Sequence, residues 1–143
     1  MKVADVMTRS VEVINPNATL AEAAEKMKAL DVGPLPVCDG DQLQGMITDR
    51  DVTIRATAEG RDPMTTRVSE AMTPEVVFTY DDEDVKDAAK LMEQHQLRRL
   101  VVLNRDKKLV GIVSLGDLAV DVKDDKLKGE VLEEISEPSQ PKR

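Results

Sequence analysis

The chain consists largely of one segment that occurs twice, and this duplication limits the possible folds more than any other sequence feature. The stretch Val3–Thr8 returns 65 residues later as Val68–Thr73. The same offset superposes apolar positions across most of each copy. After one extra residue in the second copy, Leu43–Thr48 matches Leu109–Ser114. One copy is too small to bury a core alone, so we expect the two copies to pack together.

Both copies predict the same order of elements: strand, helix, strand, strand, helix. A β-rich run opens each copy at 11–14 and 76–79, before the capping box Thr19-x-x-Glu22 and its weaker counterpart Asp84-x-x-Asp87. The apolar face of the first helix comprises Leu20, Ala23, Ala24 and Met27, and in the second copy Val85, Ala88, Ala89 and Met92. Two short strands follow, at 35–38 and 43–47 and at 100–103 and 109–113. The last helix of each copy is expected to begin near Thr48 and Ser114.

These elements predict an α+β (mixed α/β) fold, in which two β-α-β-β-α repeats pack with pseudo-two-fold symmetry. Repeat 1 is expected to span 1–62 and repeat 2 to span 63–121. The remaining residues, 122–143, are expected to form a short acidic helix and a flexible tail.

Composition argues against several classes of function. The 20 basic and 28 acidic residues give a formal net charge of −8, and the chain has one Phe, one Tyr and no Trp. Nucleic-acid binding needs a basic surface or aromatic platforms, so we expect no nucleic-acid partner. No apolar run approaches the roughly 20 residues of a membrane span and no secretory signal opens the chain, so we expect no membrane partner. The single cysteine, Cys38, cannot form an internal disulfide, which favours a cytoplasmic location.

Each copy contains the pattern Gly-h-h-[Thr/Ser]-x-x-Asp, where h is apolar, and this pattern carries the most chemistry. It occurs at Gly45–Asp51 and at Gly111–Asp117. Here a buried strand is expected to run directly into a helix, whose first backbone amides lack intrahelical partners. The hydroxyls of Thr48 and Ser114, with free amides beside them, suit a phosphate oxygen.

The carboxylates of Asp51 and Asp117, one helical turn later, can accept hydrogen bonds from two vicinal hydroxyls such as those of a ribose. Phosphate and ribose together indicate a nucleotide. Arg50 adds a positive charge in the first copy, whereas Gly116 leaves the second copy without one. The same pattern is also an ordinary helix cap. Duplication copies caps as readily as binding sites, so both interpretations remain open.

Taken together, the sequence resembles a tandem pair of CBS domains, also called a Bateman module, over roughly residues 3–121. The resemblance rests on the order and spacing of several motifs: Val3–Thr8, Val68–Thr73, Val32–Val37, Gln96–Val102 and the two Gly-h-h-[Thr/Ser]-x-x-Asp elements. The nearest look-alikes are bacterial proteins made of little more than one such pair. The resemblance implies a homodimer and adenosine ligands, such as AMP, ADP, ATP or S-adenosylmethionine, in two clefts between the repeats.

The resemblance also implies roles for individual residues. Asp51 and Asp117 match the carboxylates that bind ribose, and Thr48 and Ser114 match the hydroxyls near the phosphates. The backbone segments that lie on either side of the base in the family match Ser10 and Val11 in the first copy, and Glu75 and Val76 in the second. Apolar side chains of the adenine slot correspond to Val37 and Val102, and a phosphate is within reach of Arg98 or Arg99. Two departures, Val101 in place of Pro36 and Gly116 at the phosphate position, predict a weaker second cleft or a ligand with less phosphate.

The main hypothesis is a non-catalytic regulatory protein that senses adenine nucleotides and acts on a downstream protein that the sequence does not name. The alternative is an interaction or scaffold protein with empty clefts that acts through its dimer surface. No nucleophile, base and orienting partner stand together, so we expect no catalytic residues. No Cys/His cluster has zinc spacing, so we expect no metal site and no required cofactor.

Overall fold

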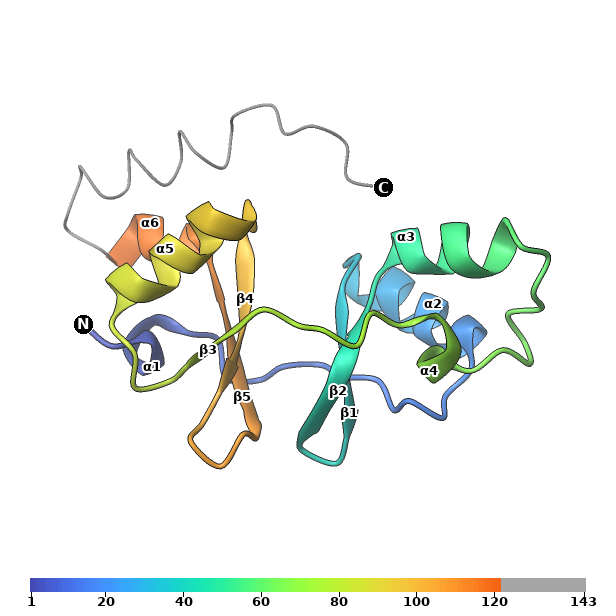
Figure 1. The fold of residues 1–143 in the computed structure, drawn as a ribbon, viewed down its shortest axis with the longest axis horizontal. Coiled ribbons are helices and arrows are strands. Elements are labelled where there is room, and N and C mark those ends of the chain that lie inside the picture. The colour runs from blue at the N-terminus through green and yellow to red at the C-terminus, as the bar shows by residue number, and fades with distance from the viewer. Residues whose placement is uncertain (122–143) are drawn as a thin grey trace. The chain divides into compact units, whose positions relative to one another are not determined.

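The computed structural model describes residues 1–121 and divides them between two compact units (Figure 1). The central unit comprises Glu12–Val76. The split unit joins Met1–Val11 to the chain from Val77 onward. The helix and tail predicted at 122–143 lie outside the described residues.

The central unit contains an antiparallel pair of strands with helices packed against it. Strand β1 (Leu35–Asp39) pairs with β2 (Gln42–Ile47), and a parallel bridge joins Ile14 to Val37. The helices are α2 (Leu20–Leu30), α3 (Asp49–Asp51) with its continuation as the π-helix η1 (Val52–Thr57), and α4 (Val68–Ala71). The core is formed by Leu20, Ala23, Met27, Leu35, Val37, Ile47, Ala56, Val68 and Ala71.

The split unit repeats this arrangement, but its sheet has three strands instead of two. Its strands are ordered β3 (Phe78–Tyr80), β4 (Arg99–Leu103) and β5 (Leu109–Ser114); β3 runs parallel to β4 and β5 runs antiparallel to it. The helices are α1 (Val3–Val6), α5 (Val85–His95) and α6 (Leu115–Asp121). The core is formed by Val3, Val6, Met7, Val85, Ala88, Ala89, Met92, Leu100, Val102, Val113 and Leu118.

The opening helix of each sequence repeat packs in the unit that is built mainly from the other repeat. Val3 is fully buried in the split unit, where its amide donates to the carbonyl of Glu83 at 2.9 Å. Val68 is fully buried in the central unit, where its amide donates to the carbonyl of Ala18 at 2.8 Å. The compact units therefore do not coincide with the sequence repeats 1–62 and 63–121.

The structure confirms the α+β class and most of the predicted elements. Three details differ. The opening strand of the first copy is reduced to the single bridge at Ile14. Ala24, predicted on the buried face of α2, is exposed, because this helix buries a narrower stripe than α5 does. The short helices α1 and α4 were not predicted, because four residues give too little hydrophobic periodicity to identify a helix.

A close crossing of two chain segments recurs in both units and explains the repeated glycine. The amide of Met46 donates to the carbonyl of Thr73 at 2.9 Å, and the amide of Thr73 donates back at 2.8 Å. Thr8 and Ile112 exchange the same pair of bonds in the split unit. A Cβ atom on Gly45 would lie 2.6 Å from the carbonyl oxygen of Thr73. The glycine is therefore required by backbone packing rather than by a flexible phosphate loop.

Replacing the crossing glycine tests this role. A Cβ on Gly111 would lie 2.7 Å from Sδ of Met7 and 2.8 Å from the carbonyl oxygen of Thr8. Gly111→Ala is therefore expected to lower the free energy of unfolding by about 1–3 kcal/mol, measured by urea denaturation. Gly116→Ala is the matched control, because its nearest neighbour is 3.5 Å away and alanine favours a helix. Equal losses from both substitutions would contradict the packing role.

The buried thiol of Cys38 gives a second test. Burial raises the pKa of Cys38 to about 11, and the Asp41 carboxylate adds to the rise. At pH 8 only about one thiol in a thousand is then ionised in the native protein, so a disulfide reagent is expected to react slowly until urea unfolds the chain. Because the unfolded thiol ionises first, stability is expected to fall as pH rises from about 9 to about 11. Rapid reaction of the native protein at pH 8 would show that this strand is open to solvent.

Candidate functional site

The candidate site residues with hydroxyl and carboxyl groups lie where a strand runs into a helix in each unit. At the junction of β2 and α3, the Thr48 hydroxyl accepts from the Asp51 amide at 3.1 Å, and the Asp51 carboxylate accepts from the Thr48 amide at 3.0 Å. Ser114 and Asp117 make the same reciprocal pair between β5 and α6, at 3.1 and 2.7 Å. Both pairs are capping boxes, so the capping interpretation of the sequence pattern is confirmed as a contact.

Capping uses one oxygen of each carboxylate. The second oxygen of Asp51 lies 3.5 Å from Nε of Arg55, one turn further along the helical segment. Asp51 is only 8% exposed, whereas the Arg55 side chain is 53% exposed. A partner that is so exposed is held weakly, so another hydrogen-bond donor could replace it. Arg55 was not among the candidate residues, although its position four residues after Asp51 is the usual spacing of a helical ion pair.

The two junctions differ in their free amides. The Asp49 amide donates to the carbonyl of Gly33 at 3.2 Å, and the Arg50 amide donates to the carboxylate of Asp49 at 3.0 Å. The expectation of free amides is therefore wrong at the first junction, because a backbone carbonyl satisfies the Asp49 amide and the Asp49 carboxylate satisfies the Arg50 amide. At the second junction, the Leu115 amide donates to the carbonyl of Arg98 at 2.7 Å. Within residues 1–121 the Gly116 amide has no hydrogen-bond partner.

The charges around the junctions also differ. The first junction carries Arg50 on α3, but it also carries the Asp49 carboxylate, which accepts a hydrogen bond from the Arg50 backbone amide. Sequence reasoning missed the role of Asp49 because an acidic residue in the first turn of a helix is commonplace. At the second junction Arg98 precedes β4, and Arg99 pairs in register with Ser114. The second junction therefore has two adjacent cations and no acidic counterpart of Asp49.

The structure groups the predicted base-bracketing residues with the junction of the opposite repeat. Ser10 and Val11 belong to the split unit, which also holds Ser114 and Asp117. Glu75 and Val76 belong to the central unit, which also holds Thr48 and Asp51. The crossing segments cause this exchange, because Thr8 forms a bridge with Ile112 of β5 and Thr73 forms a bridge with Met46 of β2.

Val37 and Val102 occupy equivalent positions on β1 and β4. Each is fully buried in the core of its own unit, and each stands opposite a crossing glycine in the strand register, Gly45 and Gly111 respectively. The structure therefore gives these two side chains a packing role. Direct contact of either with a base stays a prediction.

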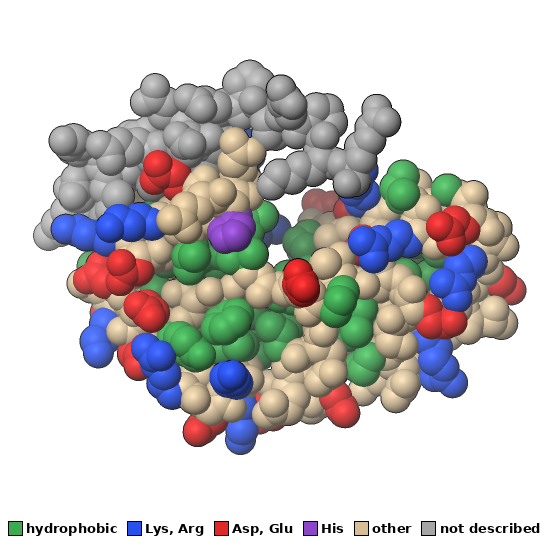
Figure 2. Space-filling model, in the orientation of Figure 1, with side chains coloured by type: hydrophobic (Ala, Val, Ile, Leu, Met, Phe, Trp, Pro, Cys, Tyr) green, Lys and Arg blue, Asp and Glu red, His purple; other side chains and the backbone are tan. Residues whose placement is uncertain are grey.

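The described part of the chain offers little evidence for other kinds of functional site. Residues 1–121 contain no group of three or more His, Cys, Asp or Glu side chains placed to hold a metal ion. His95, the only histidine, is exposed at the end of α5 (purple in Figure 2). On the face shown in Figure 2, acidic and basic side chains are interspersed rather than gathered by sign. No helix in the described residues is long and apolar enough to cross a membrane.

Comparison with known proteins gives a relative of similar length. CBS domain-containing protein YhcV from Bacillus subtilis (strain 168) is 46% identical over 134 residues, which cover 94% of each chain. This likeness extends over both units.

Two solved structures share the fold and contain adenosine compounds. CBSX2 in complex with AMP is 28% identical, with a TM-score of 0.72, over 83% of this chain and 93% of that chain. The CBS domain pair of protein MJ0100, in complex with 5′-methylthioadenosine and S-adenosyl-L-methionine, is 26% identical, with a TM-score of 0.69. This match covers 84% of this chain and 94% of the other. The CBS domain family itself matches the sequence twice, at residues 3–56 and 68–127, and the chain therefore belongs to that family.

Proposed function

We propose that this protein is a non-catalytic regulator that binds an adenine nucleotide (AMP, ADP or ATP) or a related adenosyl compound. The observation that carries the proposal is the repeated hydroxyl–carboxylate pair at the strand-to-helix junction of each unit. Further support comes from the relatives solved with AMP and with S-adenosyl-L-methionine. Ligand binding would change the conformation of the pair and so report the level of the nucleotide.

The junctions have suitable groups for a ribose. The Asp51 oxygen that faces Arg55 can accept a hydrogen bond from a ribose hydroxyl, while the other oxygen keeps the cap. The Thr48 hydroxyl accepts from a backbone amide and retains its own hydrogen to donate to a phosphate oxygen. Ser114 and Asp117 offer the same groups in the split unit.

Charge favours the junction of the split unit for a ligand with more phosphate. Arg98 precedes β4 and Arg99 opens it beside this junction, and the Gly116 amide is available as a donor. At the other junction the carboxylate of Asp49 would repel a phosphate. The absence of a side chain at Gly116 predicted the weaker phosphate site in the second copy. The charges around the two junctions favour the opposite order.

A regulator without catalytic groups must act through another protein. The proposal therefore includes a downstream protein partner. It also includes a homodimer and a cytoplasmic location, as expected from the sequence. The acidic balance of the chain, −8 in all, argues against a nucleic-acid target.

The dimer is tested by light scattering. The protein is expected to have an apparent mass near twice the 15.8 kDa of the chain at micromolar concentration. A mass near 15.8 kDa that does not change over a hundredfold range of concentration would contradict the dimer.

The ligand is tested first by what the purified protein carries. The protein is denatured, and the released small molecules are separated by chromatography and identified by mass. A stoichiometric adenine nucleotide is expected. If none is carried, the thermal midpoint is measured with AMP, ADP, ATP and S-adenosylmethionine, and at least one is expected to raise it. No carried ligand and no shift would favour the scaffold alternative.

Substitution of the two junction carboxylates tests the site. Asp51→Asn with Asp117→Asn is expected to weaken nucleotide binding by about tenfold or more, because charge-assisted hydrogen bonds to the ribose are lost. Asparagine still accepts from the capping amide, so the helices should persist. Glu22→Gln is the matched control, because Glu22 closes the capping box of α2, a helix that contributes no candidate site residue. Unchanged affinity in the double variant would contradict the site.

A further inference from the structure

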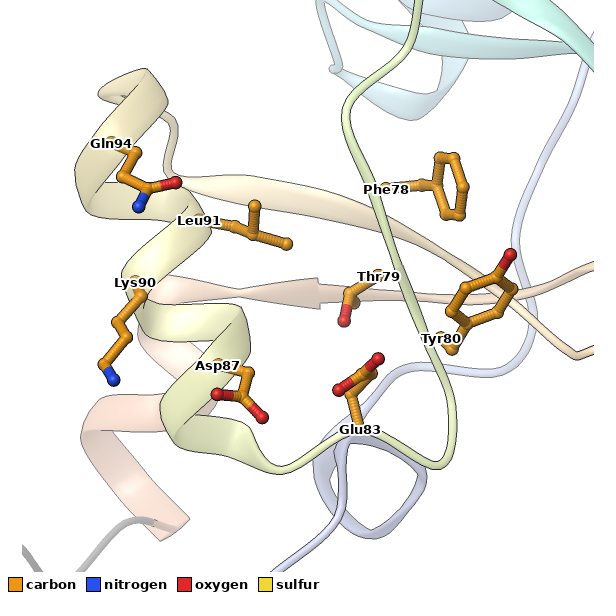
Figure 3. Close-up of a pocket in the computed structure, with 8 residues that line it drawn as sticks. All are labelled: Phe78, Thr79, Tyr80, Glu83, Asp87, Lys90, Leu91 and Gln94. Carbon is orange, nitrogen blue, oxygen red and sulfur yellow. The ribbon is translucent and has the colours of Figure 1, made fainter.

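A groove on the split unit lies between β3 and α5 (Figure 3), and neither Ser114 nor Asp117 lines it. Its volume is about 400 Å³, within the range of small-molecule sites. It is lined by Phe78, Thr79, Tyr80, Glu83, Asp87, Lys90, Leu91 and Gln94. All of these residues belong to the split unit, so the groove is complete within one compact body.

The duplication shows what closes the equivalent place in the central unit. There the ammonium of Lys26 donates to the backbone carbonyl of Val13 at 2.5 Å and lies 3.2 Å from the carboxylate of Glu12. The position 65 residues after Lys26 is Leu91, and the position after Val13 is Phe78. The split unit therefore has the same strand and helix without the ammonium that joins them.

Without this lysine, the Phe78 carbonyl lacks the donor that the Val13 carbonyl has, and the Thr79 hydroxyl beside it also lacks a partner among the described residues. Thr79 pairs in parallel with Val102, as Ile14 pairs with Val37 in the central unit. Because successive peptide groups of a strand point to opposite sides, the carbonyl of Phe78 faces away from β4, as that of Val13 faces away from β1. The Thr79 hydroxyl is itself buried, with the residue 3% exposed, and it has no hydrogen-bond partner among the described residues.

Acidic side chains add to these acceptors. In Figure 3 the Thr79 hydroxyl and the Glu83 carboxylate point toward the same space, the Asp87 carboxylate lies on the helix side of it, and Lys90 points away. Glu83 lies 3.5 Å from the exposed guanidinium of Arg105, which neutralises part of its charge. The groove thus presents a carbonyl, a hydroxyl and carboxylates beside the apolar side chain of Leu91. This combination matches an ammonium on an aliphatic stem, which carries three donors.

We propose that this groove binds a small primary amine in its ammonium form, whose charged group takes the role that the Lys26 ammonium has in the central unit. The aliphatic stem packs along Leu91, and the ammonium donates to the Phe78 carbonyl, to the acidic rim and to Thr79. This site is separate from the nucleotide junctions and does not depend on them.

The test uses n-butylammonium, which has the four-carbon stem of a lysine side chain. Its binding to the full chain is followed by NMR, through the backbone amide shifts of Phe78, Thr79 and Leu91. Saturable shifts at these residues are expected, with n-butanol binding at least about fivefold more weakly and butyrate not at all. Equal binding of n-butanol, or shifts that do not saturate, would overturn the proposal.

Two variants separate an amine site from a merely apolar groove. Leu91→Lys supplies the missing ammonium within the chain, so it is expected to abolish the shifts and raise the thermal midpoint. Ala29→Lys is the control, because it adds the same charge at an exposed position of α2. Thr79→Val is expected to raise the thermal midpoint, by removing an unpartnered buried hydroxyl, and to weaken n-butylammonium binding about threefold to tenfold. Full binding by both Leu91→Lys and Thr79→Val would overturn the proposal.

Discussion

The rest of the structure depends on one backbone contact, the reciprocal pair of hydrogen bonds between a crossing segment and the strand that leads to a helix. In the central unit this contact joins Thr73 to Met46, and in the split unit it joins Thr8 to Ile112. A glycine on each strand lets the two backbones approach. The contact fixes each crossing segment against the strand that runs into a candidate junction. The packing contact and the candidate binding site therefore lie within a few residues of each other along β2 and β5.

Much of this could be predicted from the sequence, because the two copies share local signals for the same elements. The capping box at Thr19 and the buried face of α5 follow from spacing alone. The exchange of α1 and α4 between repeats could not be predicted. Both are four-residue segments with an apolar residue at each end and an acidic residue at the third position, so local pattern does not assign either to a unit and only tertiary packing does. The residue types of the candidate site could likewise be predicted, but the balance of charges around it could not. The role of Asp49 depends on a hydrogen bond that its carboxylate accepts from the Arg50 amide, which sequence pattern does not reveal.

Duplication has preserved the geometry of the two copies while their polar groups have diverged. The capping pairs at the junctions keep nearly the same distances. Around them, Asp49 stands where the second copy has Leu115, and Gly33 stands where it has Arg98. Lys26 and Leu91 differ in the same way at the helix that covers the first strand. A repeated scaffold with unequal charge can serve two different ligands without any change in its backbone.

The exchange of opening segments also determines when each unit can form during synthesis. The central unit is continuous in the chain, so it can close once Val76 has left the ribosome. The split unit needs both Met1–Val11 and the chain from Val77 onward. The apolar side chains of Val3, Val6 and Met7 must therefore wait, without their native partners, while the central unit folds. During synthesis, the segment Met1–Val11 stays exposed until the chain from Val77 onward can pack against it.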